Sequence, residues 1–398
     1  MKTRVAVIFG GHSVEHEVSI ISGLQALNAL NTDKYEAFPL FISKDNRFYV
    51  GENLRQIASY RDMPSCLAAA TRVLPVPSAQ GIELVRYPMK KFGNNVMAAF
   101  DVAIPVVHGT NVEDGTLMGY LEMLGVPYAS CDVTSSALGM DKFAMKGALR
   151  QAGIPVLEAR QYTGKQYAVD NAAVLDDIES AIGYPVIVKP VNLGSSVGIS
   201  KAKNRAELTD AMDLVVSFSA RVLVERAVPN LREINCSVLG DYETARPSAC
   251  EEPLNAEDIL TFGDKYLSGN GGKSGGSKGM TDLKRRCPAD LPAGMTEQVQ
   301  ELAVATFKAL GCLGVARIDF LNDKESGELW VNEINTIPGS LSFYLWQEVG
   351  VSFAELMDEL VSLAFKRQRE REALTFTYES NILSGTTVGA KGCKGGKA

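Results

Sequence analysis

The chain has 398 residues, of which 46% are hydrophobic and 22% are charged, and its formal net charge is −7 at pH 7. This length and composition are typical of a globular protein with two or three domains. The negative charge argues against a general binder of nucleic acid or of anionic membranes. No stretch reaches the roughly 18 apolar residues of a membrane span, and the N-terminus lacks the apolar core of a signal peptide. The seven cysteines form no C-x-x-C pair, so we expect a cytoplasmic protein with reduced thiols.

The first hundred residues alternate apolar runs with helical patterns. Strands are expected over residues 5–9, 37–42 and 100–107, and a helix is expected over residues 18–30. Such alternation predicts a parallel α/β layer. The first turn, "GGHSVEHEVS", carries two carboxylates and two histidines and lacks the G-x-G-x-x-G spacing of a dinucleotide site. A nicotinamide-dependent oxidoreductase is therefore a weak alternative. Residues 45–95 have a less regular pattern, which is compatible with an insertion.

Two further regions follow along the chain. Helices are predicted at 136–153, 175–182, 297–310 and 353–371, and strands at 184–190, 221–228, 314–320 and 329–335. We expect domains at 1–130, 131–230 and 231–380, followed by a flexible Gly/Lys-rich tail at 381–398.

The strands "GVARIDF" and "LWVNEIN" carry the densest set of candidate metal ligands. Residues i and i+2 share one face of a strand, so Arg317 projects with Asp319, and Glu333 projects with Asn335. If the strands are neighbours, two carboxylates, a carboxamide and a guanidinium meet on one polar face. These hard oxygen ligands suit Mg²⁺, which combines one or two carboxylates with substrate phosphates. The alternative is a surface salt bridge on a half-exposed sheet.

A second candidate site lies in "VIVKPVNLGSSVGIS". Lys189 ends an apolar strand, and the small residues 194–196 allow backbone N–H groups to approach an anion closely. The spacing is not that of a Walker A loop, and an ordinary turn is the alternative. Lys142 adds a second cation. Glu225 lies at the end of another apolar strand, where backbone groups would hydrogen-bond to the edge of an adenine. Glu233, further along, would bind ribose hydroxyls. A solvated strand end is an equally good interpretation of Glu225.

These motifs, together with "EHEVS" and "HGTNVEDGTLMG", resemble the ATP-grasp ligases, specifically the D-alanine–D-alanine ligases, from about residue 4 to residue 365. The resemblance implies an ATP-grasp fold of the α/β and α+β classes, with three domains and an N-terminal parallel-sheet (pre-ATP-grasp) domain. It implies ATP-dependent joining of two D-alanines through a D-alanyl phosphate, for peptidoglycan synthesis. A sibling ligase that uses D-serine or another acceptor is the alternative. The implied partners are small molecules rather than nucleic acid or membrane, and homodimers are usual in the family.

The resemblance also implies roles for individual residues. ATP would be bound by Lys142, Lys189, Ser196, Glu225, Arg226, Ala227, Val228, Glu233 and Lys265. Two Mg²⁺ ions, with Mn²⁺ as an alternative, would be bound by Asp319, Glu333 and Asn335. Glu15 would hold the ammonium of the first D-alanine, and Ser195 and Tyr266 would hydrogen-bond to it. Arg317 and the N–H of Gly339 would stabilise the oxyanion. A nucleotide-binding regulatory protein that has lost catalysis is disfavoured, because Arg317, Asp319, Glu333 and Asn335 are all present. Further substrate contacts would come from His108, Ser340, Tyr344 and Leu345.

Two departures from the family pattern are visible. The candidate lid, residues 267–287, is unusually rich in glycine, and its Lys273, Lys278, Lys284 and Arg285 are either phosphate ligands or solvated charges. The family usually places a serine five residues after the glycine of "NTIPG", where it anchors the carboxylate of the second substrate. Here Tyr344 occupies that position, with Ser340 and Ser342 as candidate substitutes, so the acceptor preference stays open.

Overall fold

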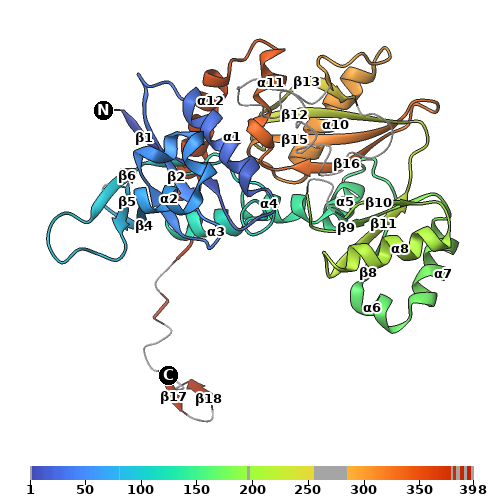
Figure 1. Cartoon of the computed structure of the whole chain (residues 1–398), viewed down its shortest axis with the longest axis horizontal. Coiled ribbons are helices and arrows are strands. Elements are labelled where there is room, and N and C mark those ends of the chain that lie inside the picture. The colour runs from blue at the N-terminus through green and yellow to red at the C-terminus, as the bar shows by residue number, and fades with distance from the viewer. Residues whose placement is uncertain are drawn as a thin grey trace.

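The computed structural model describes residues 2–79, 81–194, 198–254, 285–377, 380–381, 386–389 and 392–395. Ser195, Ser196, Lys265, Tyr266 and most of the segment 267–287 lie outside these residues. Figure 1 shows a large N-terminal sheet on one side of the molecule and two smaller sheets on the other. Within the described residues, no helix combines the length and the apolar character that a membrane crossing needs.

The N-terminal sheet has seven strands in the order β6-β5-β4-β3-β2-β1-β7. They are β1 (Thr3–Gly10), β2 (Tyr35–Ile42), β3 (Phe48–Val50), β4 (Thr71–Ser78), β5 (Gly81–Arg86), β6 (Val96–Phe100) and β7 (Val102–Pro105). The predicted parallel layer is confirmed for β2, β1 and β7, and residues 45–95 extend it with antiparallel strands. Strand β4 is buried at Val73 but exposed at Leu74 and Val76, which is the pattern of a one-sided sheet.

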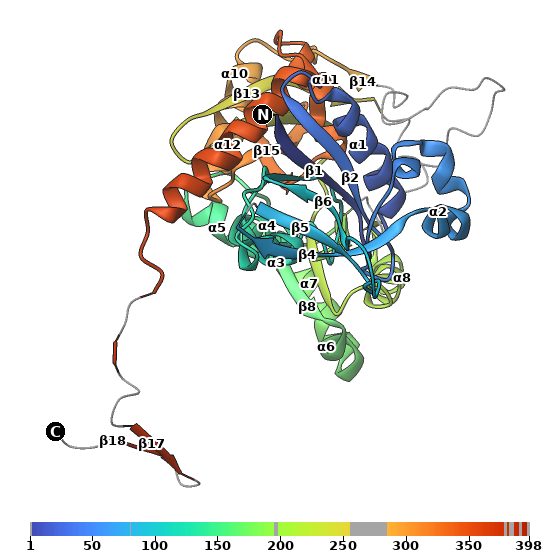
Figure 2. The ribbon, with the colours of Figure 1, turned by 90° about the vertical axis from the view of Figure 1, so that its left-hand side faces the viewer.

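Helices cover the centre of this sheet. Residues 5–9 of β1 are completely buried, because α1 (His16–Ala29) packs on this strand and α12 (Phe353–Glu372) packs against β7. Figure 2 shows α12 running along the sheet toward the C-terminal tail. The last helix of the C-terminal region therefore completes the N-terminal core, to which it contributes Leu356 and Leu360. The other helical segments here are η1 (Glu52–Arg55), η2 (Ile57–Arg61), α2 (Met63–Ala69) and α3 (Thr116–Met123).

The predicted helix over 136–153 is wrong as a single element. It is two helices, α4 (Val133–Met140) and α5 (Lys142–Gln151), separated by Asp141. The backbone of Asp141 is extended, and its side chain accepts a hydrogen bond from the N–H of Ala144, so it caps the second helix. This cap places Lys142 at the first position of α5, next to the central sheet.

The central sheet has four antiparallel strands in the order β10-β9-β11-β8. The strands are β8 (Ala159–Thr163), β9 (Val186–Pro190), β10 (Ser200–Ala202) and β11 (Arg221–Arg226). The helices are α6 (Gly164–Val169), α7 (Asn171–Ala181) and α8 (Arg205–Val216). Valines on β9 and β11 pack with α7 and α8 in one core cluster. Lys189 is the second-last residue of β9.

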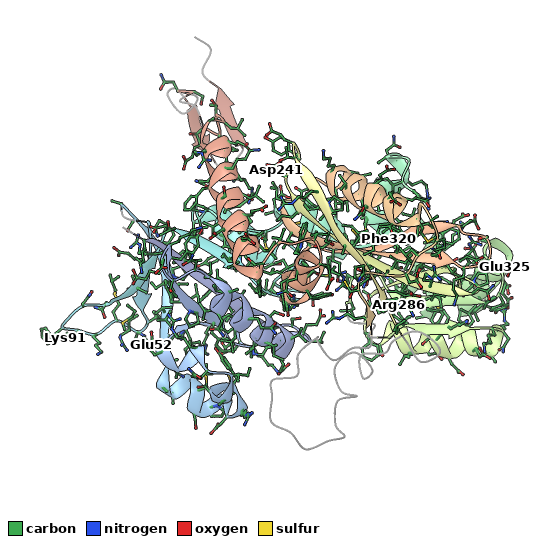
Figure 3. The ribbon with its side chains drawn as sticks, turned by 90° about the horizontal axis from the view of Figure 1, so that it is seen from above. Glu52, Lys91, Asp241, Arg286, Phe320 and Glu325 are labelled. Atoms are coloured by element: carbon green, nitrogen blue, oxygen red, sulfur yellow. The ribbon has the colours of Figure 1, made fainter. Side chains whose placement is uncertain are left out.

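The C-terminal sheet is antiparallel in the order β14-β13-β12-β15-β16. Its strands are β12 (Leu231–Gly240), β13 (Ala245–Pro253), β14 (Arg285–Arg286), β15 (Gly314–Asp323) and β16 (Leu329–Asn335). Helix α10 (Met295–Ala309) packs on the face of β15 that carries Ile318 and Phe320, and Figure 3 labels Phe320 in this sheet. The opposite face carries Arg317 and Asp319. After β16 come η4 (Gly339–Ser342) and α11 (Phe343–Gln347).

The tail contains two short strands, β17 (Thr386–Gly389) and β18 (Gly392–Gly395), which pair with each other. The predicted domain boundaries and the flexibility of the tail stay predictions.

We expect two glycine-to-alanine substitutions to have opposite effects on stability. Gly10, at the end of β1, has a φ of +98°, and a methyl group there would lie 2.1 Å from the carbonyl oxygen of Ile42. Gly10→Ala should lower the free energy of unfolding by at least about 2 kcal/mol, because it combines backbone strain with a clash. Gly147, inside α5, has open space at this position, so Gly147→Ala should raise stability by about 0.5–1 kcal/mol. Urea denaturation measures both, and equal stability of the two variants would contradict the expectation.

Candidate active site

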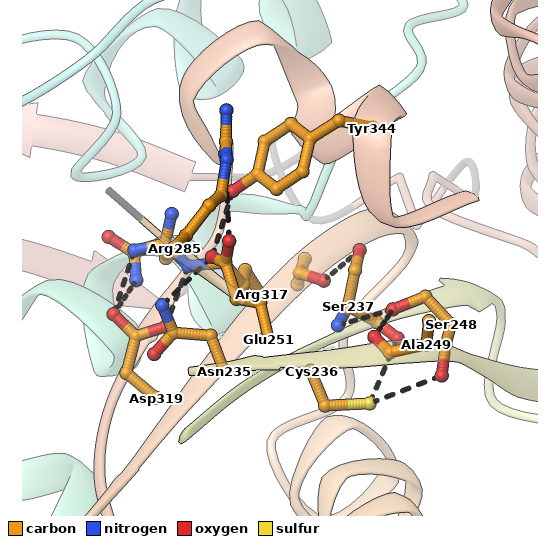
Figure 4. Close-up of polar contacts among 12 residues, drawn as sticks. Asn235, Cys236, Ser237, Ser248, Ala249, Glu251, Arg285, Arg317, Asp319 and Tyr344 are labelled. Carbon is orange, nitrogen blue, oxygen red and sulfur yellow. Dashed lines mark hydrogen bonds and ion pairs between the residues drawn. The ribbon is translucent and has the colours of Figure 1, made fainter. Parts of the chain in front are cut away.

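The polar face of β15 and β16 is the centre of the candidate site. The two strands are neighbours, and their register places Arg317 opposite Asn335 and Asp319 opposite Glu333. The Nε and Nη2 groups of Arg317 donate to the two carboxylate oxygens of Asp319 at 2.7 and 2.8 Å, and Asn335 donates to Asp319 at 3.0 Å (Figure 4). Burial disfavours the charge on Arg317, but Asp319 more than compensates and raises the pKa of the guanidinium well above its usual value.

A lysine from α5 faces the second carboxylate of this group. The Nζ of Lys142 lies 3.3 Å from Glu333 Oε2 and donates to the carbonyl oxygen of Leu193 at 2.9 Å. Lys142 and Arg317 thus neutralise Glu333 and Asp319. The described residues hold no group of three or more His, Cys, Asp or Glu side chains that could bind a metal by themselves. Two carboxylates and one carboxamide nevertheless fit Mg²⁺ as a partial shell, which water and substrate phosphates complete.

The second carboxylate group is a buried ion cluster. The carboxylate of Glu225 lies between Lys189, at 2.5 Å, and Lys146, at 3.0 Å, and all three side chains are almost inaccessible to solvent. Burial raises the pKa of Glu225, but the two lysines outweigh this effect and the net shift is downward. Lys146 is not among the residues predicted from the sequence. Its position four residues after Lys142 is the available signal, because residues i and i+4 share one face of a helix.

A β-bulge contributes one more polar group. The register of β15 and β16 shifts between Asp319 and Phe320, so that Asp319 pairs with Glu333 while Phe320 pairs with Val331. Asn332 is the extra residue, and its Oδ1 accepts a hydrogen bond from Lys189 at 3.1 Å. Because of the bulge, the side chain of Asn332 points toward the site. In a regular strand it would point to the other face of the sheet.

The other residues predicted to bind the nucleotide lie at the end of β11, just after it and on β12. The N–H of Ala227 donates to the carbonyl oxygen of Pro185, and the guanidinium of Arg226 lies over the ring of Trp330 at 4.8 Å. Val228 is half-buried. Glu233 lies on β12, two residues before Asn235 and therefore on the same face of the strand.

Glu15 lies where loops from two regions meet. It precedes α1 and is 9% exposed. A methyl group on Gly109 would lie 2.8 Å from Oε2 of Glu15, and one on Gly194 would lie 3.0 Å from the same atom. Only glycine allows the two backbones to approach this carboxylate so closely. The first loop of the N-terminal sheet thus adjoins the glycine loop of the central sheet.

Glu113 is a further buried carboxylate that the sequence analysis did not single out, although it lies in the motif "HGTNVEDGTLMG". It accepts hydrogen bonds from the N–H groups of Gly109 and Ile337, both at 2.9 Å, and from the hydroxyl of Thr336 at 3.3 Å. Burial, followed by repulsion from Glu15, raises the pKa of Glu113 to about 7. Glu113 ties the N-terminal sheet to the loop that leads to Gly339.

His108 supports the same loop. Its Nδ1 lies 3.0 Å from the carbonyl oxygen of Ile337, which can only accept, so Nδ1 carries the proton. Its Nε2 then accepts from the hydroxyl of Ser22, which itself accepts from the N–H of Ser340. Burial lowers the pKa of His108 to about 4, so the ring is neutral at pH 7. Both ring nitrogens of His108 are thus hydrogen-bonded within the protein. Its contact with the substrate stays a prediction.

The loop after Gly339 has an unusual backbone. Ser340, Leu341 and Ser342 have φ values of 51°, 54° and 51°, a left-handed conformation that L-residues rarely adopt in succession. The hydroxyl of Ser340 donates to Gln25 on α1 at 2.5 Å. Tyr344 donates to Glu251 at 2.9 Å, and the side chain of Leu345 is completely buried. Tyr344, which is predicted to contact the second substrate, therefore lies beside Glu251, a carboxylate that is not among the residues predicted from the sequence.

Glu113→Gln should change how stability depends on pH. A carboxyl group with a raised pKa binds more protons in the folded chain than in the unfolded chain between pH 4.5 and about 7. Its contribution to the free energy of unfolding therefore decreases by about 1.4 kcal/mol per pH unit as the pH rises through this window. The lowered pKa of His108 acts in the opposite direction between about 4 and 6.5. The free energy of unfolding of wild type minus that of Glu113→Gln should therefore be about 2 kcal/mol larger at pH 5 than at pH 7.

Urea denaturation at the two pH values measures this difference. The matched control is Glu301→Gln, which changes an exposed glutamate on α10. A pH-independent difference between wild type and Glu113→Gln would contradict the raised pKa.

The chain is similar to known proteins over most of its length. The family described as D-ala D-ala ligase N-terminus matches residues 4–131, and the family described as D-ala D-ala ligase C-terminus matches residues 148–362. The D-alanine–D-alanine ligase of Acetivibrio thermocellus is 38% identical over 93% of this chain and 97% of its own length. That of Thermosipho melanesiensis is 35% identical over 95% and 98%.

Two solved structures are also similar. The D-alanine-D-alanine ligase from Coxiella burnetii has a TM-score of 0.76 and 29% identity, over 93% of this chain and 96% of its own. The VanG D-Ala:D-Ser ligase from Enterococcus faecalis has a TM-score of 0.73 and 30% identity, over 92% of this chain and 100% of its own. The matched families cover both the N-terminal sheet and the strands that carry Asp319 and Glu333, and the chain therefore belongs to the D-alanine–D-alanine ligase family.

Proposed function

We propose that this protein joins two D-alanines in an ATP-dependent reaction that passes through a D-alanyl phosphate and supplies peptidoglycan synthesis. The observation that carries the proposal is the polar face of β15 and β16, where Arg317, Asp319, Glu333 and Asn335 are in register. Family membership supports ATP as the co-substrate. A cytoplasmic location and a homodimer are part of the proposal: the location rests on the composition and cysteine content of the sequence, and the homodimer rests on the resemblance.

The chemistry begins with a carboxylate, which is a poor electrophile until it is phosphorylated. Lys142 and Lys189 would bind the phosphates of ATP, and Asp319, Glu333 and Asn335 would hold Mg²⁺. The Mg²⁺ would supply positive charge to the transferring phosphoryl group. Glu15 would bind the ammonium of the first D-alanine and so aim its carboxylate at the γ-phosphate. Positioning of the reactants accounts for most of the acceleration in such transfers.

The second half-reaction needs a different set of groups. The amine of a second D-alanine would attack the acylphosphate, and Arg317 and the N–H of Gly339 would stabilise the tetrahedral oxyanion. Loss of a proton from the amine nitrogen and cleavage of the carbon–oxygen bond to phosphate would then release inorganic phosphate and leave the dipeptide. Removal of one donor to the oxyanion typically costs about 3 kcal/mol of transition-state stabilisation. His108 and Glu113 would act as positioning residues, because their hydrogen bonds hold Ile337 two residues before Gly339. Ser195, Ser196, Lys265 and Tyr266 stay predictions for substrate binding and closure.

The buried cluster around Glu225 supports a modified description of the adenine pocket. Both carboxylate oxygens of Glu225 face lysines. We propose that backbone groups of Arg226, Ala227 and Val228 read the adenine edge, and that Glu225 chiefly fixes Lys189 in position. Glu233 would bind the ribose.

D-Serine is a second candidate acceptor, favoured by Tyr344 at the position of the usual serine and by the similarity to a D-Ala:D-Ser ligase. A phosphate-release assay with ATP, Mg²⁺ and D-alanine, with and without D-serine, distinguishes them. We expect D-alanine alone to sustain rapid phosphate release with D-alanyl-D-alanine as the product. Slow release with D-alanine and fast release after D-serine is added would overturn this preference, and no release with either would overturn the proposed function.

Glu333→Gln should reduce the rate of phosphate release at least about a hundredfold, because it removes a negative oxygen ligand from the proposed metal site. The carboxamide has nearly the same shape, but it leaves the buried Lys142 without its counter-charge, so urea denaturation checks that the variant is folded under the assay conditions. The control is Glu328→Gln, an exposed glutamate immediately before the same strand, which should keep wild-type activity. Wild-type activity in Glu333→Gln would remove this residue from the metal site.

A further inference from the structure

The hairpin between β5 and β6 ends in a tip, residues 87–95, that carries exposed apolar side chains. Phe92 is 82% exposed, Met89 is 69% exposed and Tyr87 is 47% exposed. Single exposed apolar residues are common on protein surfaces, but several large ones on one loop usually mark a surface that binds something. The tip lies in the segment 45–95, whose pattern is compatible with an insertion, and the proposed function uses none of its residues.

The charge of the tip is opposite to that of the whole chain. Lys90 and Lys91 are at its centre, and the sequence has no acidic residue between Glu83 and Asp101. Both lysines are exposed, and within the part of the chain that the structure describes no carboxylate forms an ion pair with either. Lys91 Nζ instead lies 5.7 Å from the centroid of the Phe92 ring. The net charge of −7 does not cancel this local charge, because exposed charges beyond about 10 Å are largely screened at about 0.1 M salt.

The tip projects from the molecule and is braced. Figure 1 shows the loop between β5 and β6 extending beyond the edge of the N-terminal sheet, and Figure 3 labels Lys91 at one end of the molecule. The N–H of Lys90 donates to Asn95 Oδ1 at 2.8 Å, and the amide of Asn95 donates to the carbonyl oxygen of Lys90 at 3.1 Å. The guanidinium of Arg72 on β4 lies over the ring of Tyr87, 4.6 Å from its centroid. The tip can therefore meet a flat surface before the rest of the molecule does.

Exposed apolar side chains beside lysines are the composition by which a loop binds an anionic bilayer. The apolar side chains enter the boundary between headgroups and acyl chains, and the lysines stay among the anionic headgroups. A second copy of this chain is a weaker candidate, because two tips that met across a symmetry axis would bring their lysines together without acidic residues. A protein partner would have to supply an acidic recess, whereas a bilayer accepts a projecting loop as it is.

We propose that the β5–β6 tip docks on an anionic lipid bilayer, with Phe92 and Met89 inserted at the interface and Lys90 and Lys91 on the lipid headgroups. The proposal goes beyond the proposed function and does not depend on it, because none of these residues belongs to the candidate site. The contact is peripheral and reversible, since one short loop buries far less apolar surface than a membrane-spanning helix. It departs from the expectation from the sequence that no membrane is among the partners.

Co-sedimentation of the full chain with lipid vesicles tests the proposal. One set of vesicles contains phosphatidylcholine alone, and the other contains equal parts of phosphatidylcholine and the anionic phosphatidylglycerol. Wild type should bind the anionic vesicles at least about tenfold more strongly, and added salt should weaken this binding, because the lysines act through electrostatic attraction. Lys90→Gln combined with Lys91→Gln should weaken binding to the anionic vesicles at least about tenfold, and so should Phe92→Ser.

The matched controls change the same kinds of side chain on another part of the surface. Lys165→Gln combined with Lys203→Gln removes two exposed lysines, and Val169→Ser changes an apolar side chain that is 79% exposed. Figure 1 shows α6, which carries Lys165 and Val169, in a different part of the molecule from the tip. These variants should keep wild-type binding within about twofold, because their charges lie beyond the screening length of the docked surface.

Phe92→Trp reports whether the tip enters the bilayer. The native Trp330 and Trp346 are 9% and 0% exposed, so a change in emission on vesicle binding would come from the substituted position. Emission should move to shorter wavelength with anionic vesicles, and lipids brominated in their acyl chains should quench it. Urea denaturation should show all tip variants to be as stable as wild type, because the substituted side chains are exposed.

Three results would overturn the proposal. The first is that wild type does not bind anionic vesicles at low salt, and the second is that the tip variants bind them as strongly as wild type. The third is that vesicles leave the protein unbound while Phe92→Ser abolishes self-association in sedimentation velocity, which would assign the tip to contact with a second copy.

Discussion

The register between β15 and β16 is the constraint on which the rest of the site depends. A one-residue slip between the strands would turn their side chains to the opposite face of the sheet. Depending on which strand moved, Asp319 or Glu333 would then point into the apolar core under α10. Ile318, Phe320 and Ile334 prevent the slip, because each is buried on the α10 side in the observed register. Apolar packing on one face thus fixes the chemistry on the other.

Charge balance explains how so many ionised groups are tolerated in a poorly hydrated region. Asp319 faces Arg317, Glu333 faces Lys142, and Glu225 lies between two lysines. Removing one member of such a buried pair typically costs 3–5 kcal/mol, whereas the intact pair contributes little to stability. These ion pairs are therefore better understood as a means of holding cations where phosphates are expected than as a source of stability. Glu113 differs, because it is held by neutral donors instead of a cation, so burial and the charge of Glu15 outweigh its hydrogen bonds and raise its pKa.

Residues that follow strands of the N-terminal sheet also hold the loop around Gly339 in place. Glu113, His108 and Ser22 all bond to the segment from Thr336 to Ser340, either directly or through one another. This segment enters a left-handed turn, and a backbone of that kind persists only where its surroundings hold it in place. The position of the Gly339 N–H therefore depends on contacts from a sheet more than two hundred residues earlier in the chain, since Glu113 and Ile337 are 224 residues apart.

The sequence by itself determined the elements whose signals are local. Alternation of side chains along two strands predicted that Arg317 shares a face with Asp319, and Glu333 with Asn335. The spacing of the turn "GGHSVEHEVS" argued against a dinucleotide site. The bulge at Asn332 and the cap at Asp141 escaped prediction, because regular periodicity does not reveal where a strand gains a residue or a helix stops. Only the tertiary structure decided the pairing of Lys146 with Glu225, of Glu113 with Ile337, and of Arg285 with Tyr344 and Glu251. Residues such as Glu251 and Tyr344, 93 positions apart, meet because sheet and helix packing brings them together, and no local pattern in a single sequence encodes that distance.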